Sequence, residues 1–418
     1  MHSHLSRPAH EILGQPLMLP NGIELPNRIA KAAMSEALGT ADNRVTPALE
    51  KLYARWSEGG CGLLITGNVM VDRRALGEPG NIVLEDERDM DLLQRWASAG
   101  SRYGNQLWVQ LNHPGKQAPL GLNRETVSPS AVPFSPAMQR FFGTPRALEV
   151  AEIEDIITRF GTAARLAKEA GFTGIQIHGA HGYLVGQFLS PHHNVRTDEW
   201  GGSPENRRRF VLRVLSAIRA EVGAQFPVGI KLNSADFQKG GFSEEESLNT
   251  IKALSEAGID LIEISGGTYE APAMTGVRAK ESTRKREAYF LEFAEKARAT
   301  VSTPLMLTGG FRTADGMAAA IDSGAVDLVG LARLLAIEPD APNRLLAGHS
   351  TYHHVRLIRT GIKAVDRMAL MEITWYTRQL RRMGKGRHPK PTESGFKSFL
   401  IGLLENGWGT FKTKRMRA

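Results

Sequence analysis

Short apolar runs alternate with longer amphipathic segments along most of this chain. The runs cover residues 29–34, 62–69, 106–111, 174–178, 228–232, 261–265, 305–308 and 328–331. Continuous apolar runs of this length, bounded by turn residues, are typical of strands buried on both faces of a parallel sheet. Helical spacing of apolar residues appears between them, at about 47–59, 88–103, 152–170, 205–222, 244–257, 287–301, 313–322 and 340–347. The pattern predicts eight strand–helix units.

Eight such units favour an α/β fold of the closed (β/α)8 TIM-barrel type. An open doubly wound sheet is the competing arrangement, and it usually carries a GxGxxG fingerprint after its first strand. The first strand here leads into Met34-Ser35-Glu36 instead. We therefore predict a barrel over residues 1–350 and a basic helical C-terminal extension over 351–418. The long connection at 112–151, rich in Pro and Ser, has a length that is usually functional, for example as a lid over a site.

Composition narrows the class of protein without naming a function. Hydrophobic residues make up 42% of the chain and charged residues 23%, which are globular values, and no apolar run approaches the ~20 residues that span a bilayer. The start, MHSHLSRPAH, lacks the basic-then-apolar order of a signal peptide. The single cysteine, Cys61, excludes an internal disulfide framework and any all-cysteine metal or iron–sulfur site. We expect a cytoplasmic protein.

The net charge of +8 is concentrated in the tail. Residues 351–418 hold 15 Lys and Arg against 4 Asp and Glu, so the rest of the chain is slightly acidic. A basic tail can contact nucleic acid or an anionic membrane, but a solvated helical extension is the commoner meaning of such a run. We expect neither of those partners. Trp375, Trp408 and the apolar run at 399–404 suggest instead that the extension affects self-association, in a homo-oligomer, or substrate access.

Every predicted strand ends in a polar group or a glycine. The carboxyl ends of barrel strands meet at one rim, where catalytic residues of such folds lie. We therefore expect the functional site at this rim. In chain order the ends carry Met34-Ser35, Thr66-Gly67, Gln110 with Asn112-His113, His178 with His181, Lys231, Ser265-Gly266-Gly267, Gly309-Gly310 and Ala332-Arg333.

The last two strand ends predict a phosphate site. Gly309 and Gly310 allow the backbone to approach an anion and present N–H donors, and Arg333 adds a charge-assisted hydrogen bond. Barrels often bind phosphate with the loops after strands seven and eight. The alternative is a pair of tight turns in which glycine only supplies an unusual φ.

His178 and His181 admit three interpretations. They could be metal ligands, perhaps with His113, in a barrel hydrolase, but Lys231 at a neighbouring strand end would repel a metal ion. They could donate hydrogen bonds to a substrate carbonyl oxygen that gains negative charge, or be structural. Tyr183 follows as a candidate general acid, or as an amphipathic core tyrosine. Lys231 ends an apolar strand, so its partner is an anion, either a ligand or a local carboxylate such as Asp236.

These residues also carry a resemblance. The chain resembles the old yellow enzyme family of FMN-dependent ene-reductases, in its NADH:flavin oxidoreductase branch, from about residue 17 to residue 339. The most specific part is His178-Gly-Ala-His181-Gly-Tyr183-Leu184, followed by Gln187-Phe-Leu-Ser-Pro191 and by Asn194-Val-Arg196-Thr-Asp198-Glu-Trp-Gly201-Gly202-Ser203. Gln110-Leu-Asn112-His113-Pro114-Gly115 and the two phosphate turns also fit.

The resemblance implies FMN as cofactor, NADH or NADPH as reductant, and an enone-type small molecule as substrate. His178 and His181 would bind the substrate carbonyl oxygen, His178 would also border the flavin, and Tyr183 would protonate the α-carbon. Lys231 would face flavin N1 and the C2 carbonyl. The remaining positions implied to contact FMN are Ala33, Met34, Ser35, Gly67 and Gln110 along the ring and Gly309, Gly310, Ala332 and Arg333 at the phosphate.

The sequence departs from the family pattern at three positions. Lys231 stands where many members have Arg, Ser35 where Thr or Cys is common, and Ala332 where Gly is frequent. None of these changes removes a required chemical group. Two other functions stay open from the residues alone. They are the metal-dependent hydrolase and a non-enzymatic flavin- or phosphate-binding barrel whose basic tail docks a partner.

Overall fold

Eight parallel strands close into a barrel, which confirms the predicted TIM-barrel fold. The computed structural model describes residues 5–268, 270–271, 287–349, 358–362, 366 and 370–404. Around the ring the strands follow the order β10-β11-β12-β3-β4-β5-β8-β9, and β9 pairs with β10. They are β3 (Ile29–Lys31), β4 (Leu63–Met70), β5 (Gln106–Asn112), β8 (Gly174–Gly179), β9 (Val228–Asn233), β10 (Leu261–Ser265), β11 (Leu305–Thr308) and β12 (Leu328–Leu331).

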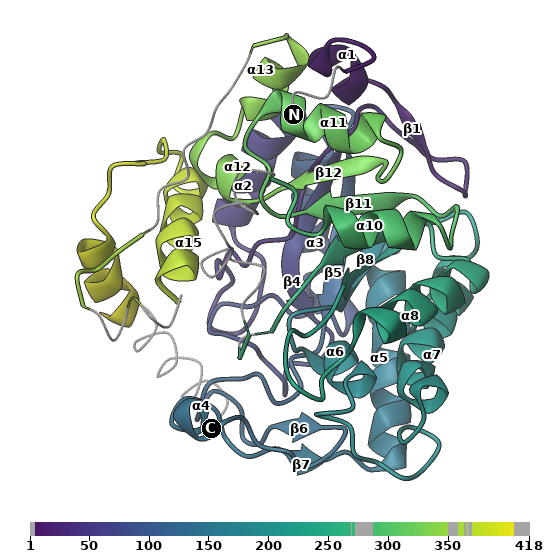
Figure 1. Cartoon of the computed structure of the whole chain (residues 1–418). Coiled ribbons are helices and arrows are strands. Elements are labelled where there is room, and N and C mark those ends of the chain that lie inside the picture. Colours follow the sequence, from purple (N-terminus) through teal and green to yellow (C-terminus); the bar gives the residue numbers. More distant parts are fainter. Residues whose placement is uncertain are drawn as a thin grey trace.

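Helices surround this ring, as Figure 1 shows. They begin at clear sequence signals; α8, for example, starts with a capping box between Ser243 and Glu246. The helices after the barrel strands are α2 (Pro47–Glu58), α3 (Met90–Gly100), α5 (Val150–Glu169), α6 (Leu184–Leu189), α7 (Pro204–Val222), α8 (Glu244–Glu256), α10 (Leu291–Arg298), α11 (Ala314–Asp322), α12 (Arg333–Ile337) and α13 (Ala341–Leu346).

Two predicted boundaries are wrong for local reasons. The first strand ends at Lys31, not at residue 34, because the chain leaves the ring there to form the edge of the site. The helix predicted over 287–301 begins at Leu291. Glu287 and Ala288 have φ angles of 56° and 39°, which a right-handed helix does not accommodate. The Tyr289 N–H donates a hydrogen bond of 3.1 Å to the Gly309 carbonyl. This segment therefore packs on the turn after β11.

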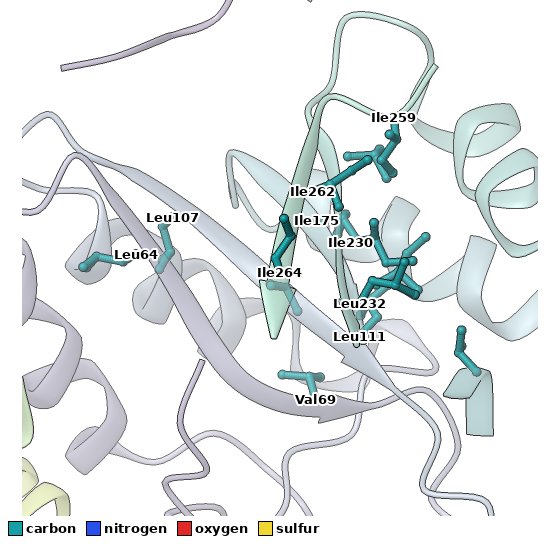
Figure 2. Packing of buried hydrophobic residues seen from close by; sticks show 14 of the residues in the cluster. Leu64, Val69, Leu107, Leu111, Ile175, Ile230, Leu232, Ile259, Ile262 and Ile264 are labelled. Atoms are coloured by element: carbon teal, nitrogen blue, oxygen red, sulfur yellow. The ribbon is translucent and has the colours of Figure 1, made fainter. Parts of the chain in front are cut away.

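Alternate strand positions face outward and form the layer between sheet and helices. Leu107, Ile175, Ile230 and Ile262 are fully buried in this layer, and Figure 2 shows the three isoleucines close together and Leu107 beside Leu64. Burying one such side chain contributes about 1.5–3 kcal/mol. Cys61, just before β4, lies in the same layer as a free, buried thiol. Burial raises its pKa to about 12, although nearby Lys31 opposes the shift.

The amino end of the barrel is closed by a plug of apolar side chains. The lead-in forms a short helix, α1 (Ala9–Leu13), and an antiparallel hairpin of β1 (Leu17–Met18) and β2 (Glu24–Leu25). Leu17 and Leu25 pack in one cluster with the inward residues Leu63, Trp108 and Leu261. The opposite, carboxyl end of the strands is therefore left for the site.

Trp108 fills the interior near the amino end of the barrel because the two positions that face its ring are glycines. A Cβ at Gly174 would lie 2.5 Å from Trp108 Cδ1, and one at Gly229 would lie 2.8 Å from Cζ3. We expect Gly174→Ala to lower the free energy of unfolding by about 1–3 kcal/mol through overpacking. Denaturant unfolding measures this. Gly77→Ala is the matched control, because its Cβ would meet nothing closer than 3.6 Å; equal losses in both variants would contradict the packing argument.

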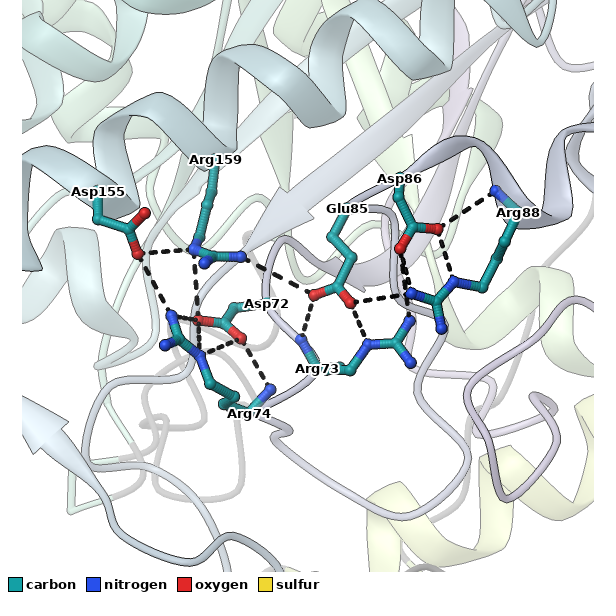
Figure 3. Close-up of polar contacts among 8 residues, drawn as sticks. All are labelled: Asp72, Arg73, Arg74, Glu85, Asp86, Arg88, Asp155 and Arg159. Atoms are coloured by element: carbon teal, nitrogen blue, oxygen red, sulfur yellow. Dashed lines mark hydrogen bonds and ion pairs between the residues drawn. The ribbon is translucent and has the colours of Figure 1, made fainter. Parts of the chain in front are cut away.

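Ion pairs hold the loop after β4 against helix α5. Asp72, buried just beyond the strand, pairs with Arg74 at 2.7 Å and with Arg159 of α5 at 3.6 Å. Arg159 also pairs with Asp155 one turn earlier, at 2.8 Å. This network fixes the loop beside the carboxyl end of β4. Figure 3 shows it continuing through Arg73, Glu85, Asp86 and Arg88.

The long connection after β5 carries short elements of its own. They are β6 (Val127–Ser128), α4 (Pro136–Gln139) and β7 (Arg146–Ala147), and β6 pairs with β7. Lys116 anchors the connection: its buried Nζ donates to the Val132 carbonyl at 2.9 Å and lies 3.0 Å from His193 Nδ1. The connection is thus fastened to the loop that follows α6.

The C-terminal extension contributes helix α15 (Leu370–Gly384), which packs beside α2 and α12 on the outside of the barrel (Figure 1). Trp375 is buried and donates from Nε1 to the Glu393 carbonyl at 3.0 Å. Trp408, part of the sequence argument for this extension, lies outside the described residues. Within the described ranges, no helix combines the length and apolarity that a membrane crossing requires.

Candidate active site

The histidine pair and Tyr183 converge at the carboxyl end of β8. The ring centroids of His178 and His181 are 5.3 Å apart, and the Tyr183 ring lies 4.7 Å from that of His178. His178 Nδ1 accepts the Ala180 N–H at 3.3 Å, so a neutral His178 carries its proton on Nε2. The three residues predicted to act together therefore form one cluster, in which His178 offers an N–H donor.

His181 is held in position by the neighbouring strands. Its φ of 61° is unusual for a residue other than glycine, and its N–H donates to Oδ1 of Asn233, the last residue of β9, at 3.2 Å. Its Nε2 shares a hydrogen bond of 2.8 Å with Ser265 Oγ at the end of β10. Backbone strain of this kind persists only where the surroundings fix it, and it gathers at functional sites.

Both imidazoles are neutral at physiological pH. Burial lowers the pKa of His181 to about 3, with Lys231 as a second cause. Burial, His181 and Lys231 hold the pKa of His178 well below its ordinary value of 6.5. The two histidines can therefore donate hydrogen bonds to an oxygen but carry no positive charge at this pH.

The pH dependence of the reaction follows from these low pKa values. Because the histidines stay neutral as the pH falls, we expect kcat/KM to show no acid limb from them between pH 5 and 7. A pH profile of wild type beside His178→Asn/His181→Asn, which keeps amide donors, measures this. A limb near pH 6.5 in wild type that the variant lacks would contradict the neutral assignment.

Lys231 pairs with a carboxylate inside the barrel. Its Nζ lies 2.9 Å from Glu263 Oε1, and both side chains are almost fully buried. The two residues are direct neighbours in the register between β9 and β10, and His178 is the neighbour of Lys231 on β8. Asp236, the carboxylate that the local sequence suggested, instead accepts the Phe242 N–H at 3.0 Å. The Asp236 alternative is therefore wrong.

A chain of hydrogen bonds runs from Glu263 to Gln110. Glu263 Oε2 accepts Gln176 Nε2 at 2.7 Å, and Gln176 Oε1 accepts Gln110 Nε2 at 2.8 Å. Thr308 of β11 donates to Glu263 Oε1 at 2.6 Å. Inward-facing residues of four strands thus form one polar layer beneath the rim.

The edge of the site at β3 and β4 is closely packed around Gly67 and Glu36. β4 bulges between Ile65 and Asn68, and the Gly67 N–H within the bulge donates to buried Glu36 at 2.9 Å. A side chain at Gly67 would overlap the Glu36 carboxylate, so only glycine fits there. Ser35 Oγ is buried and makes no hydrogen bond with any described residue. A buried hydroxyl without a partner suits a site that a polar ligand completes.

The turn after β11 already binds an anion of the protein. Gly309 and Gly310 have φ angles of 123° and 93°. The Glu287 carboxylate accepts the Arg312 N–H at 2.9 Å and the Thr313 N–H at 3.3 Å, at the start of α11. Since β11 and β12 are paired neighbours, Ala332 and Arg333 follow the adjacent strand at the same rim. The donors here match the chemistry of a phosphate.

Several contributors to this site were missed from the sequence, among them Gln176, Glu263, Glu36 and Thr377. Glu263 had a readable signal, a charged residue at an inward position of the apolar run 261–265. Glu36 had none beyond its place after the first strand. Thr377 of α15 donates to the Ser35 carbonyl at 3.3 Å, a contact across the chain that no local pattern indicates. The site residues that were predicted from the sequence lie in the carboxyl half of a barrel strand or directly after it.

Comparison with known proteins identifies the family. Residues 13–351 match the model of the NADH:flavin oxidoreductase / NADH oxidase family. The chain belongs to this family. It is 38% identical to NADH-dependent flavin oxidoreductase iliE of Hypocrea jecorina (strain QM6a) over 358 residues, 80% of this chain and 88% of the relative. The relative iccE of Talaromyces variabilis is 37% identical over 411 residues, 89% of this chain and 98% of the relative.

Solved structures of other reductases resemble this chain in fold. 2-Naphthoyl-CoA reductase in complex with 2-naphthoyl-CoA has a TM-score of 0.75 at 28% identity, covering 81% of this chain and 52% of that one. Morphinone reductase in complex with tetrahydroNAD has a TM-score of 0.68 at 25% identity, covering 82% of this chain and 92% of that one.

Family membership confirms the resemblance to old yellow enzymes. The protein is an oxidoreductase that uses FMN and NAD(P)H. The buried Ser35 hydroxyl and the anion-binding turn after β11 fit such a cofactor. Within the described ranges, no three His, Cys, Asp or Glu side chains are grouped so as to hold a metal ion. Given the family, the hydrolase and non-enzymatic alternatives give way to the flavin enzyme.

Proposed function

We propose that this oxidoreductase reduces the C=C bond of α,β-unsaturated carbonyl compounds. The observation that carries the proposal is the cluster of two neutral imidazoles and a phenol at the end of β8, with ring centroids 4.7–5.3 Å apart. Such a cluster offers hydrogen-bond donors for a carbonyl oxygen and an acid for a nearby carbon. 2-Naphthoyl-CoA, which the similar reductase binds, has a carbonyl conjugated to carbon–carbon double bonds.

The residues proposed to hold FMN lie around the same rim. Lys231 would face flavin N1 and the C2 carbonyl, and Gln110 and His178 would border the ring. Ser35 would lie near the C4 carbonyl, where its buried hydroxyl supplies a donor. The remaining proposed contacts are Ala33, Met34 and Gly67 along the ring and Gly309, Gly310, Ala332 and Arg333 at the phosphate.

When bound, FMN supplies a hydride that it has taken from NAD(P)H. His178 and His181 hold the carbonyl oxygen of the alkene and stabilise the negative charge that develops there as the β-carbon is reduced. Tyr183 gives its phenol proton to the α-carbon, which completes a two-electron, two-proton-equivalent reduction. Burial of His178 limits the competition from water for its hydrogen bond.

Isotope transfer tests the function directly. NADH deuterated at the transferable position of nicotinamide C4 and a simple cyclic enone are incubated with the holoenzyme without oxygen. We expect the saturated ketone with deuterium at the β-carbon, and solvent-derived hydrogen at the α-carbon in D2O. NADH oxidation that leaves the enone intact in air and stops under nitrogen would overturn the proposal in favour of a plain oxidase.

We propose further that residues 351–418 form an extension distinct from the barrel domain of residues 1–350. The support is α15, which packs on α2 and α12 and reaches the Ser35 carbonyl through Thr377. We propose that this extension influences self-association or substrate access in a homo-oligomer. Removing residues 351–418 and measuring oligomer mass and KM tests this, since unchanged values in a folded holoenzyme would count against it.

A further inference from the structure

Glu263 is an unusual residue for the inside of a barrel. It is fully buried, yet its two carboxylate oxygens accept three hydrogen bonds from three other strands. Lys231 Nζ lies 2.9 Å and Thr308 Oγ1 2.6 Å from Oε1, and Gln176 Nε2 lies 2.7 Å from Oε2. Buried carboxylates are costly unless they are paired in this way. Its position directly below the rim suggests a role beyond packing.

The carboxylate dictates which way two amides point. An ionised carboxylate only accepts hydrogen bonds, so Gln176 must turn its Nε2 toward Glu263. Gln176 then presents Oε1 to Gln110, and Gln110 must in turn donate its own Nε2, at 2.8 Å. The Oε1 of Gln110 is therefore the amide atom left to accept a hydrogen bond from a ligand.

The same carboxylate offsets a charge. Lys231 would otherwise present an uncompensated ammonium to the proposed flavin position. Lys231 Nζ lies 2.9 Å from Glu263 Oε1, so the positive charge of the lysine is offset by the negative charge of the carboxylate. A positive charge beside flavin N1 stabilises the reduced ring, which gains negative charge there. The pair therefore supplies less of that stabilisation than a lone lysine would.

We propose that Glu263 is a positioning residue that sets both the polarity of Gln110 and the effective charge of Lys231 toward the flavin. The proposal rests on the flavin contacts assigned to Gln110 and Lys231 under the proposed function. The pyrimidine edge of a flavin carries one N–H donor, at N3, between two carbonyl oxygens. A Gln110 fixed with Oε1 outward pairs with that donor. A moderated Lys231 keeps the reduced flavin a stronger hydride donor.

The test separates charge from orientation with two variants. Glu263→Gln keeps the shape but removes the charge, so we expect a more positive flavin midpoint potential. The two-electron reduction equilibrium should shift by about 10-fold, which corresponds to about 30 mV. Gln176→Leu breaks the relay but leaves the ion pair, so we expect FMN to bind about 10-fold more weakly with little change in potential. Dye equilibration measures the potential and fluorescence titration the FMN dissociation constant.

Lys231→Met is the control that separates this proposal from the site assignment. Removing the ammonium should shift the potential in the negative direction. If Lys231→Met changes neither potential nor FMN affinity, the proposed flavin contact itself is wrong. If it shifts the potential while Glu263→Gln matches wild type, the role of Glu263 is overturned and the site stands. Should Glu263→Gln not fold, a wild-type FMN dissociation constant in Gln176→Leu would overturn the relay.

Discussion

Replacing both His178 and His181 with alanine is expected to lower kcat/KM for a simple enone by about 10³-fold or more. Loss of one preorganised donor to a developing oxyanion costs about 10²–10³-fold, and this variant removes two. The proposed donors would act at close to full strength because the two rings lie 5.3 Å apart and His178 is buried. Anaerobic steady-state kinetics with NADH and cyclohexenone measure the effect.

A third histidine supplies the control for this double variant. His192 lies on the loop after α6, where its Nε2 is 3.3 Å from Gln238 Nε2, and it has no proposed contact with substrate. We expect His192→Ala to retain kcat/KM within about 3-fold of wild type, as for a substitution away from the chemistry. A double variant that binds FMN and still turns over within about 10-fold of wild type would refute the assigned donors.

Tyr183→Phe is expected to separate the two halves of the catalytic cycle. General acid catalysis contributes about 10²–10⁴-fold, so reoxidation of the reduced enzyme by an enone should slow by that order. Reduction by NADH should stay within about 2-fold of wild type, because hydride transfer to the flavin draws no proton from Tyr183. Phenylalanine also keeps the ring that packs 4.7 Å from His178.

Stopped-flow absorbance of the flavin measures both halves with the same sample. The reductive half uses NADH without enone, and the oxidative half uses dithionite-reduced enzyme mixed with enone. Equal slowing of the two halves would indicate a disturbed cofactor rather than a lost proton. An oxidative rate equal to that of wild type would assign the proton to another donor.

The barrel could be predicted from the sequence because its determinants are local. Apolar runs such as 174–178 and 261–265 alternate with helical spacing, and eight such units fit a closed barrel. The rim followed from the same logic, since strand ends in a parallel barrel share one face. The sequence alone therefore places His178 and His181 together at this rim.

The partners inside the barrel could not be predicted in this way. Lys231 pairs with Glu263 on the next strand, 32 positions later, although Asp236 is only five positions away. Closure of the ring decides that pairing, because neighbouring strands bring residues of one layer into register. The contact between Thr377 and the Ser35 carbonyl depends on how α15 packs, which charge and composition do not encode.

The burial of Cys61 affects how well the protein would resist alkylation by the substrates proposed for it. Electron-poor alkenes alkylate thiolates, and the reactive form of cysteine is the thiolate. The chain has one cysteine, with 3% of its surface exposed and a pKa of about 12, so it offers almost no nucleophilic sulfur to such compounds at neutral pH. If its substrates are the electron-poor alkenes proposed above, the enzyme would be exposed to them through many turnovers without losing its fold to covalent adducts at sulfur.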